Sequence, residues 1–336
     1  ACHTEGGSMN RSRSRVLSST LSPVPPLRAT HLPSRLFDIS PTEGSASHPR
    51  PHLIDSADTH TRDCELAARH SVRPDYLERQ QPAINAAMRR DLINWLISID
   101  QCIDFGRSNG PEGAEALCLA INYIDRFLSI AAHIDPSELQ LVGASALLLA
   151  AKFEEIHAPA LDDLVYLSHG AYAAEQLVRM ERRMLCALGF ELCTATPHTF
   201  LSRFAKVEER HTLSTTRCGM ASPPPNRPVW QVAGVLTAPR HKAEVFASYL
   251  VELSLVCYEM LKYSSPTLAA AVLYFALGKY ALPWPRELCA LFTGEDHFAD
   301  FFRCVMDIKF VSDSASGISR ELGVKYQHAL AVGTST

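Results

Sequence analysis

Residues 139–155 carry the most restrictive pattern in the chain, because apolar side chains face almost every direction around this predicted helix. Four small residues, Gly143 to Ala146, follow one another near its middle. A helix that is apolar all round is typically buried at the centre of a bundle. Small residues on such a helix let its neighbours approach closely. We therefore expect residues 139–155 to form the central helix of a bundle.

The same pattern returns in the second half of the chain, between Thr267 and Lys279. When Lys152 is aligned with Lys279, residues 143–151 align with residues 270–278, apolar over apolar along most of the length and with small residues paired at both ends. An internal repeat of this kind indicates two copies of one structural unit. No strand-like alternation of useful length accompanies it. The sequence therefore predicts an all-α fold of two tandem five-helix bundles, although the repeat alone does not exclude a single irregular helical domain.

Apolar periodicity marks the other helices of the first bundle. Apolar residues at i, i+4, i+7, i+8 and i+11 form one stripe over residues 88–99, which is the spacing of an amphipathic helix. The remaining segments of the first bundle with helical spacing are residues 117–128, 161–168 and 172–188.

Helical spacing returns after the expected linker, over residues 246–260. Pro266, which follows this segment, suits the first turn of the second central helix.

Composition sets the expected domain boundaries. Residues 1–60 are rich in proline and serine and lack apolar periodicity, so we expect a disordered N-terminal tail. Residues 206–241 contain the Pro223–Pro225 run and are interpreted as a linker or surface insertion. The first bundle is then expected over residues 61–205 and the second over residues 242–330.

Charge and composition argue against several other classes of protein. The net charge of −4 provides no basic surface for a nucleic acid. The longest apolar runs, residues 141–151 and 268–277, are far shorter than the roughly 20 residues that cross a bilayer. The ten cysteines are scattered without a CxxC pair, so no metal site and no cofactor are predicted, and a reduced intracellular compartment fits best.

Short motifs follow one another through the first bundle and continue into the second. They are Pro74–Leu77, Gln81–Asn85, Asn122–Ser129, Leu139–Gly143, Lys152–Ile156, Leu188–Phe190, Tyr249–Leu255 and Tyr263–Thr267. Their order and spacing over residues 70–330 resemble the two cyclin boxes of mitotic A/B-type cyclins, of which this chain would be a divergent member. The resemblance implies a regulatory subunit, not an enzyme, that binds and activates a cyclin-dependent serine/threonine protein kinase in cell-cycle control.

The resemblance also implies which residues contact the kinase. Lys152 and Glu181 match the lysine and glutamate with which the family hydrogen-bonds kinase backbone groups and fixes the kinase's regulatory helix. Charges with fixed partners in a desolvated contact supply geometry as well as attraction. Without the surrounding motifs, each would be interpreted as an ordinary exposed charge. The apolar part of the contact would come from Leu149, Phe153, Leu185, Phe190 and Leu192, some of which must also belong to the core.

A structural ion pair is implied as well. Arg89 and Asp125 match a buried pair that ties the first two helices of the bundle together in the family. Removing either partner would leave an uncompensated buried charge, which is strongly destabilising. We therefore expect a structural role for this pair.

The substrate-docking patch departs from the family pattern. In related cyclins a shallow apolar groove binds Arg-x-Leu motifs of substrates and inhibitors. Here Asp91 stands where the family has an aliphatic residue, and Ser98 where it has an acid. Covering a carboxylate with a leucine is costly unless the carboxylate is paired, so we expect weak or altered Arg-x-Leu binding. The matching positions are Met88, Asp91, Leu92, Trp95, Ser98, Leu139 and Gln140.

Two other functions compete with the mitotic assignment. One is a transcriptional or other non-mitotic cyclin, and the other is a cyclin fold like that of general transcription factors, which would need a basic face or a zinc ribbon. The scattered histidines form no catalytic constellation. We expect the protein in the nucleus and cytoplasm. Open questions are the kinase partner, the cell-cycle phase, the substrates, the native start of a chain that begins with Ala1, and whether Arg50–Leu53 is a destruction signal.

Overall fold

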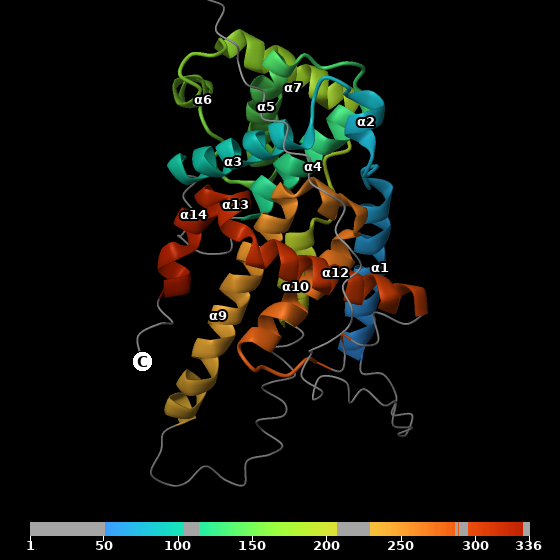
Figure 1. Ribbon diagram of the computed structural model, residues 1–336, viewed down its shortest axis with the longest axis vertical. Helices are drawn as coiled ribbons and strands as arrows, with labels where there is room; N and C mark the ends of the chain where they lie inside the picture. Colours follow the sequence, from blue (N-terminus) through green and yellow to red (C-terminus); the bar gives the residue numbers. More distant parts are fainter. Residues whose placement is uncertain (1–50, 104–113, 207–228, 286–287, 289–294, 332–336) are drawn as a thin grey trace, which may run out of the picture. The chain divides into compact units, whose positions relative to one another are not determined.

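The computed structural model describes residues 51–103, 114–206, 229–285, 288 and 295–331 (Figure 1). Throughout these residues the regular secondary structure is helical, with no strand. The expected all-α fold is therefore confirmed. Residues 1–50 of the expected tail, including Arg50 of the candidate destruction signal, lie outside the described residues, as do residues 207–228 of the expected linker.

The first lobe contains the five helices that the sequence predicts, at nearly the predicted bounds. Asn85 begins the first of them, because its side-chain oxygen accepts a hydrogen bond from the backbone N–H of Met88 at 2.9 Å. The helices are α3 (Ala86–Cys102), α4 (Ala114–Ile130), α5 (Leu139–Glu154), α6 (Leu161–Leu167) and α7 (Ala174–Ala187), with a 3-10 turn, η3 (Pro136–Glu138), leading into α5.

Two further helices precede these five. α1 (Pro51–Arg69) begins inside the expected tail of residues 1–60, and α2 (Tyr76–Gln80) follows it. Arg203, in a helix over residues 197–206, donates a hydrogen bond to the carbonyl of Thr59 at 3.2 Å and forms an ion pair with Asp63. These contacts hold α1 against the fold although its residues are polar on average.

α5 is the buried centre of the first lobe, as its sequence predicts. Every residue from 141 to 151 is buried, and the helix contacts α3, α4 and α7. Gly143 faces Leu92 of α3 so closely that an added Cβ would lie 2.7 Å from Leu92 Cδ1. A side chain at this position would therefore force Leu92 to move in the contact between α3 and α5.

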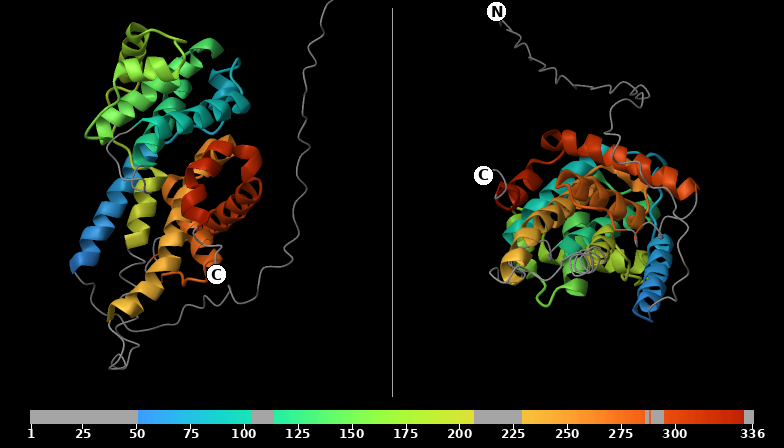
Figure 2. Two further views of the ribbon diagram at one scale, coloured as in Figure 1. Left: turned by 90° about the vertical axis from the view of Figure 1, so that its left-hand side faces the viewer. Right: turned by 90° about the horizontal axis from the view of Figure 1, so that it is seen from below.

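α10 (Ser265–Lys279) is the counterpart of α5 in the second lobe. Ser264 begins it by accepting a hydrogen bond from the N–H of Thr267 at 3.4 Å, and Pro266 occupies the first turn. It packs against α9 (Val229–Val256) and α12 (Glu295–Asp313), and both views of Figure 2 show α9 (amber) beside α10 (orange). The remaining elements are η4 (Tyr258–Lys262), α13 (Ala315–Ile318) and α14 (Arg320–Ala331).

The expected linker is shorter than its predicted range of residues 206–241. α9 already begins at Val229, and Arg240 within it donates a hydrogen bond to the carbonyl of Ala205 at 2.9 Å. The sequence does not predict this early start, because Pro239 lies inside α9 and proline normally interrupts a helix. The described part of the linker is therefore helical from residue 229 onward.

Arg89 and Asp125 form a fully buried ion pair between α3 and α4. Arg89 Nε donates to Asp125 Oδ1 at 2.7 Å and Nη2 donates to Oδ2 at 2.6 Å, while Tyr76 donates to Oδ1 at 2.7 Å. Burial alone would lower the pKa of Arg89, but the Asp125 carboxylate outweighs it and raises that pKa. Arg89 Nη1 also donates to the carbonyls of Leu255 and Val256 in α9, at 3.1 and 3.3 Å. The pair therefore joins the two lobes as well as the two helices.

A second buried charge cluster, which the sequence analysis missed, also joins the lobes. Lys325 of α14 donates hydrogen bonds to Asp100 of α3 at 3.3 Å and to Glu252 of α9 at 2.9 and 3.0 Å. Tyr326 donates to Glu252 at 2.6 Å. Burial would lower the pKa of Lys325, but the two carboxylates raise it. Residues from three helices are thus held together at one point.

Candidate functional site

Lys152 and Glu181 lie side by side, although 29 residues separate them in the sequence. Lys152 is in the last turn of α5 and Glu181 is in the middle of α7, and Lys152 Nζ donates a hydrogen bond to Glu181 Oε1 at 2.6 Å. The Lys152 side chain is 48% exposed and that of Glu181 is 13% exposed. The pair therefore sits at the surface of the first lobe with its acid partly desolvated.

Large apolar side chains next to this pair in the sequence point into solvent. Phe153 and Phe190 are exposed, Phe190 by 68%, and Ile156 is 91% exposed. Large apolar groups that gather into one exposed patch mark a protein contact, and these three residues are candidates for such a patch. The sequence analysis did not predict Ile156 as a contact residue, although it ends the Lys152–Ile156 motif. It could have been found because it lies just after the end of α5 at Glu154, where the run of buried residues has already stopped.

The backbone places Phe190 outside the core. α7 ends at Ala187, and both Gly189 and Phe190 have positive φ angles, 62° and 60°. The N–H of Phe190 donates back to the carbonyl of Leu185 at 3.0 Å, which closes the helix end. Positive φ is uncommon for a bulky residue and costs about 1 kcal/mol or more. An exposed phenylalanine held in this conformation is a good candidate for a contact residue.

The other apolar residues expected at the contact are less accessible. Leu185 and Leu192 are partly buried, and both pack against the core cluster. Leu149 is buried within its own lobe. It is one of the expected contact residues that belong to the core, and it offers little area to a partner.

The residues of the expected docking patch share one part of α3 and the start of α5. Asp91 extends outward with 75% of its side chain exposed, and its nearest cation is Arg90 at 3.8 Å. Leu92 and Leu139 are buried, whereas Met88, Trp95 and Gln140 are partly exposed. Ser98 donates its hydroxyl hydrogen bond to the carbonyl of Asn94 at 3.2 Å. The carboxylate of Asp91 is thus available to a partner.

Neither a metal site nor a membrane span is found within the described residues. Among them, no group of three or more histidine, cysteine, aspartate or glutamate side chains is arranged to hold a metal ion. None of their helices is long and apolar enough to cross a membrane.

Comparison with known proteins gives matches along most of the chain. The model of the cyclin N-terminal domain matches residues 59–193, and that of the cyclin C-terminal domain matches residues 195–331. The helix over residues 197–206, which the sequence analysis assigned to the first bundle, falls in the second match. The start of that match at residue 195 also places the segment up to α9 inside the second domain.

Three relatives illustrate the similarity. Cyclin-B2-4 of Arabidopsis thaliana is 35% identical over 208 residues, 62% of this chain and 40% of the relative. Cyclin-A1 of Xenopus laevis is 36% identical over 251 residues, 74% and 50% of the two chains. Cyclin-A3-2 of Arabidopsis thaliana is 29% identical over 277 residues, 80% and 66%. The chain thus spans about half the length of these relatives.

A solved structure shares the fold. The X-ray structure of a viral cyclin from herpesvirus saimiri superposes with a TM-score of 0.55 at 17% sequence identity, covering 77% of this chain and 96% of that one. At this identity the likeness concerns the arrangement of helices alone.

Proposed function

This chain belongs to the cyclin family, and we propose that it binds and activates a cyclin-dependent serine/threonine protein kinase. In this role it supplies no catalytic group of its own. Its relatives include both A-type and B-type cyclins, which favours cell-cycle control of the mitotic type. We further propose that it acts in the nucleus and cytoplasm. A transcriptional or other non-mitotic cyclin is the alternative within the family.

The observation that carries the proposal is the surface around Lys152 and Glu181. An ammonium has three N–H donors, and the bond to Glu181 Oε1 uses one of them. The others are free to donate to backbone carbonyls of a kinase, and the second carboxylate oxygen can accept from a backbone N–H. Because the two side chains already hold each other, little ordering is needed when the kinase binds.

The apolar residues around the pair would supply most of the affinity. Phe153, Ile156 and Phe190 are exposed in the free protein, and exposed large apolar groups are the usual anchors of protein interfaces. Covered by the kinase, they would exclude water from the Lys152–Glu181 pair and strengthen its hydrogen bonds. The contact would then fix the kinase's regulatory helix in its active position.

The docking patch suggests how substrates are chosen. We propose that an Arg-x-Leu peptide binds weakly or in an altered position, with the arginine paired to the exposed Asp91 carboxylate. Titration of a fluorescent Arg-x-Leu peptide should then show binding that Asp91→Ala weakens. Nanomolar binding that is unaffected by Asp91→Ala would contradict this assignment.

The test of kinase activation is co-purification with candidate cyclin-dependent kinases followed by histone phosphorylation. We expect the wild type to activate one of them and Lys152→Ala/Glu181→Ala to lose most of that activation. Asp300→Ala/Arg303→Ala is the matched control, because this exposed ion pair of α12, at 2.7 Å, lies in the other lobe. If Lys152→Ala/Glu181→Ala activates as well as the wild type, the assigned interface is wrong.

A further inference from the structure

The turn that exposes Phe190 is tied to helices outside it. Within the turn, the N–H of Glu191 donates a hydrogen bond to the carbonyl of Leu188 at 3.1 Å. From outside, Tyr123 of α4 donates its hydroxyl hydrogen bond to the carbonyl of Leu192 at 2.8 Å. The residues that follow Phe190 are therefore fixed to α4 through the backbone.

The side chain of Glu191 joins the same turn to the end of α1. His70 Nε2 lies 2.9 Å from Glu191 Oε2, although 121 residues separate the two in the sequence. This hydrogen bond lowers the pKa of Glu191, and Arg69 of α1 and Arg126 of α4 lower it further by attraction. An ionised carboxylate only accepts hydrogen bonds, so Nε2 donates whether or not the ring is charged. The carboxylate of Glu191 is thus the link between α1 and the turn.

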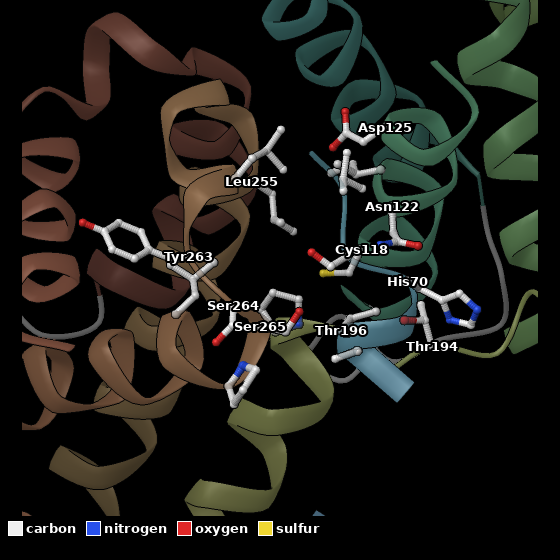
Figure 3. A pocket seen from close by; sticks show the side chains of 18 of the residues that line it. His70, Cys118, Asn122, Asp125, Thr194, Thr196, Leu255, Tyr263, Ser264 and Ser265 are labelled. Carbon is white, nitrogen blue, oxygen red and sulfur yellow. The ribbon is translucent and has the colours of Figure 1, made fainter. Parts of the chain in front are cut away.

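His70 is too deeply buried to be a contact residue itself. It is 6% exposed, and its backbone N–H extends α1 by donating to the carbonyl of Leu66 at 3.3 Å. The residue also lines a cavity of about 300 Å³, on the opposite side from Tyr263 and Ser264 (Figure 3). Because this cavity leaves open space beside the residue, packing alone does not hold the ring in place. Without the hydrogen bond to Glu191, the ring could turn into that space and the link would be lost.

The conformation of Phe190 needs such outside support. A bulky residue with positive φ persists only where its surroundings impose that conformation, and Phe190 has a φ of 60° with 68% of its surface exposed. Its own side chain therefore packs too little to hold it. We propose that His70 is a positioning residue of the kinase contact, which acts through Glu191 to hold the turn that directs Phe190 toward the kinase. Because this role depends on a kinase binding at Phe190, it rests on the proposed function.

Hydrogen exchange in the free protein tests the positioning without any kinase. His70→Leu keeps a side chain of similar size but has no donor, whereas His70→Gln places an amide N–H near the position of Nε2. In peptides that cover residues 190–192, His70→Leu should speed amide exchange at least about threefold, and His70→Gln should stay close to the wild type. His297→Leu, at an exposed histidine of α12, is the matched control. Unchanged exchange in His70→Leu, or equally faster exchange throughout both lobes, would refute the proposal.

Kinase affinity tests the consequence of the positioning. With the kinase that co-purifies with the wild type, calorimetry should show that His70→Leu weakens binding about three- to tenfold, as suits the loss of one hydrogen bond. In the Phe190→Ser background the same change should weaken binding less than about twofold, because no ring is left to position. In the Ile156→Ser background it should have its full effect. A full effect of His70→Leu beside Phe190→Ser would mean that His70 acts by another route and would refute the proposal.

The two measurements separate the role of His70 from the proposed function. If Phe190→Ser weakens kinase binding but His70→Leu changes neither exchange nor affinity, the kinase contact stands and the role of His70 is refuted. If Phe190→Ser binds the kinase as well as the wild type, the contact assigned to Phe190 is wrong, and the role of His70 falls with it. Should His70→Leu not fold, Glu191→Ala removes the acceptor at an exposed position, and faster exchange of residues 190–192 in that variant decides.

Discussion

Arg89 is the residue on which both lobes depend. Its guanidinium is fully buried, donates two hydrogen bonds to Asp125 and directs a third nitrogen at the carbonyls of Leu255 and Val256. Lysine could not replace it, because only the planar fork of arginine reaches the carboxylate and the helix end together. A buried charge with all its partners in place specifies one arrangement of the chain around it.

Loss of this guanidinium should be costly. Arg89→Met leaves the Asp125 carboxylate buried without its cation, and we expect the free energy of unfolding to fall by about 3–5 kcal/mol. Urea denaturation followed by circular dichroism measures the change. Arg303→Met removes one partner of an exposed pair and should cost less than about 1 kcal/mol. If the free energy of unfolding fell equally in the two variants, burial would not explain how much the Arg89–Asp125 pair contributes to stability.

At the scale of single helices, α5 and α10 share a sequence pattern but differ in how closely their glycines contact neighbouring residues. Both are central helices of their lobes, and the alignment of Lys152 with Lys279 pairs small residues at its two ends. Gly143 of α5 is in close contact with Leu92, but a Cβ added to Gly278, near the end of α10, would meet no neighbouring atom within 4 Å. The two glycines, which occupy different places in the alignment (Gly143 over Ala270 and Gly278 over Ala151), therefore have opposite roles.

Alanine at these two glycines should change stability in opposite directions. Gly143→Ala forces Leu92 or α3 to move, and we expect a loss of about 1–3 kcal/mol. Gly278→Ala meets no obstacle and gains helix propensity, so the protein should become more stable by up to about 1 kcal/mol. Thermal unfolding by circular dichroism measures both. A stabilising Gly143→Ala would mean that the close approach of α3 to α5 is absent.

The sequence predicts the elements better than their contacts. The five helices of the first lobe follow from apolar spacing, since that spacing records which side of each helix is buried. The early parts of α1 and α9 were not predicted, because the start of α1 is polar and lies in the expected tail and Pro239 interrupts α9. Helical spacing alone does not predict that Lys152 contacts Glu181 or that Lys325 contacts Glu252. The first contact was expected from the family resemblance, whereas the second is seen only in the structure.

At the scale of the whole molecule, the buried clusters around Arg89 and Lys325 imply that the lobes unfold together. Each cluster contains residues of both lobes, so separating the lobes exposes or strands charged groups on both sides. Tyr258 adds a further link, because its hydroxyl accepts from the N–H of Leu77 at 3.1 Å. We therefore expect the two repeats to unfold as one unit, although each has its own central helix.

Tryptophan fluorescence can test this coupling. Trp95 lies in α3 and Trp284 lies after α10, so two variants that retain one or the other, with Trp230 replaced by phenylalanine in both, report on separate lobes. We expect the same urea midpoint from both reporters. Lys325→Met, which removes the cation that Asp100 and Glu252 share, should separate the midpoints. Distinct midpoints without that change would show that the lobes unfold independently.

The central claim is that a kinase binds the first lobe at the exposed surface beside Lys152, and one measurement tests it most directly. Calorimetry should compare the kinase affinity of Ile156→Ser/Phe190→Ser with that of Met306→Ser/Phe310→Ser, a pair of exposed apolar residues on α12. The kinase is the one that co-purifies with the wild type. We predict at least about a 100-fold loss for the first pair, since two anchors disappear, and no more than about a threefold change for the second. Unchanged affinity in Ile156→Ser/Phe190→Ser, or a loss confined to Met306→Ser/Phe310→Ser, would contradict the account.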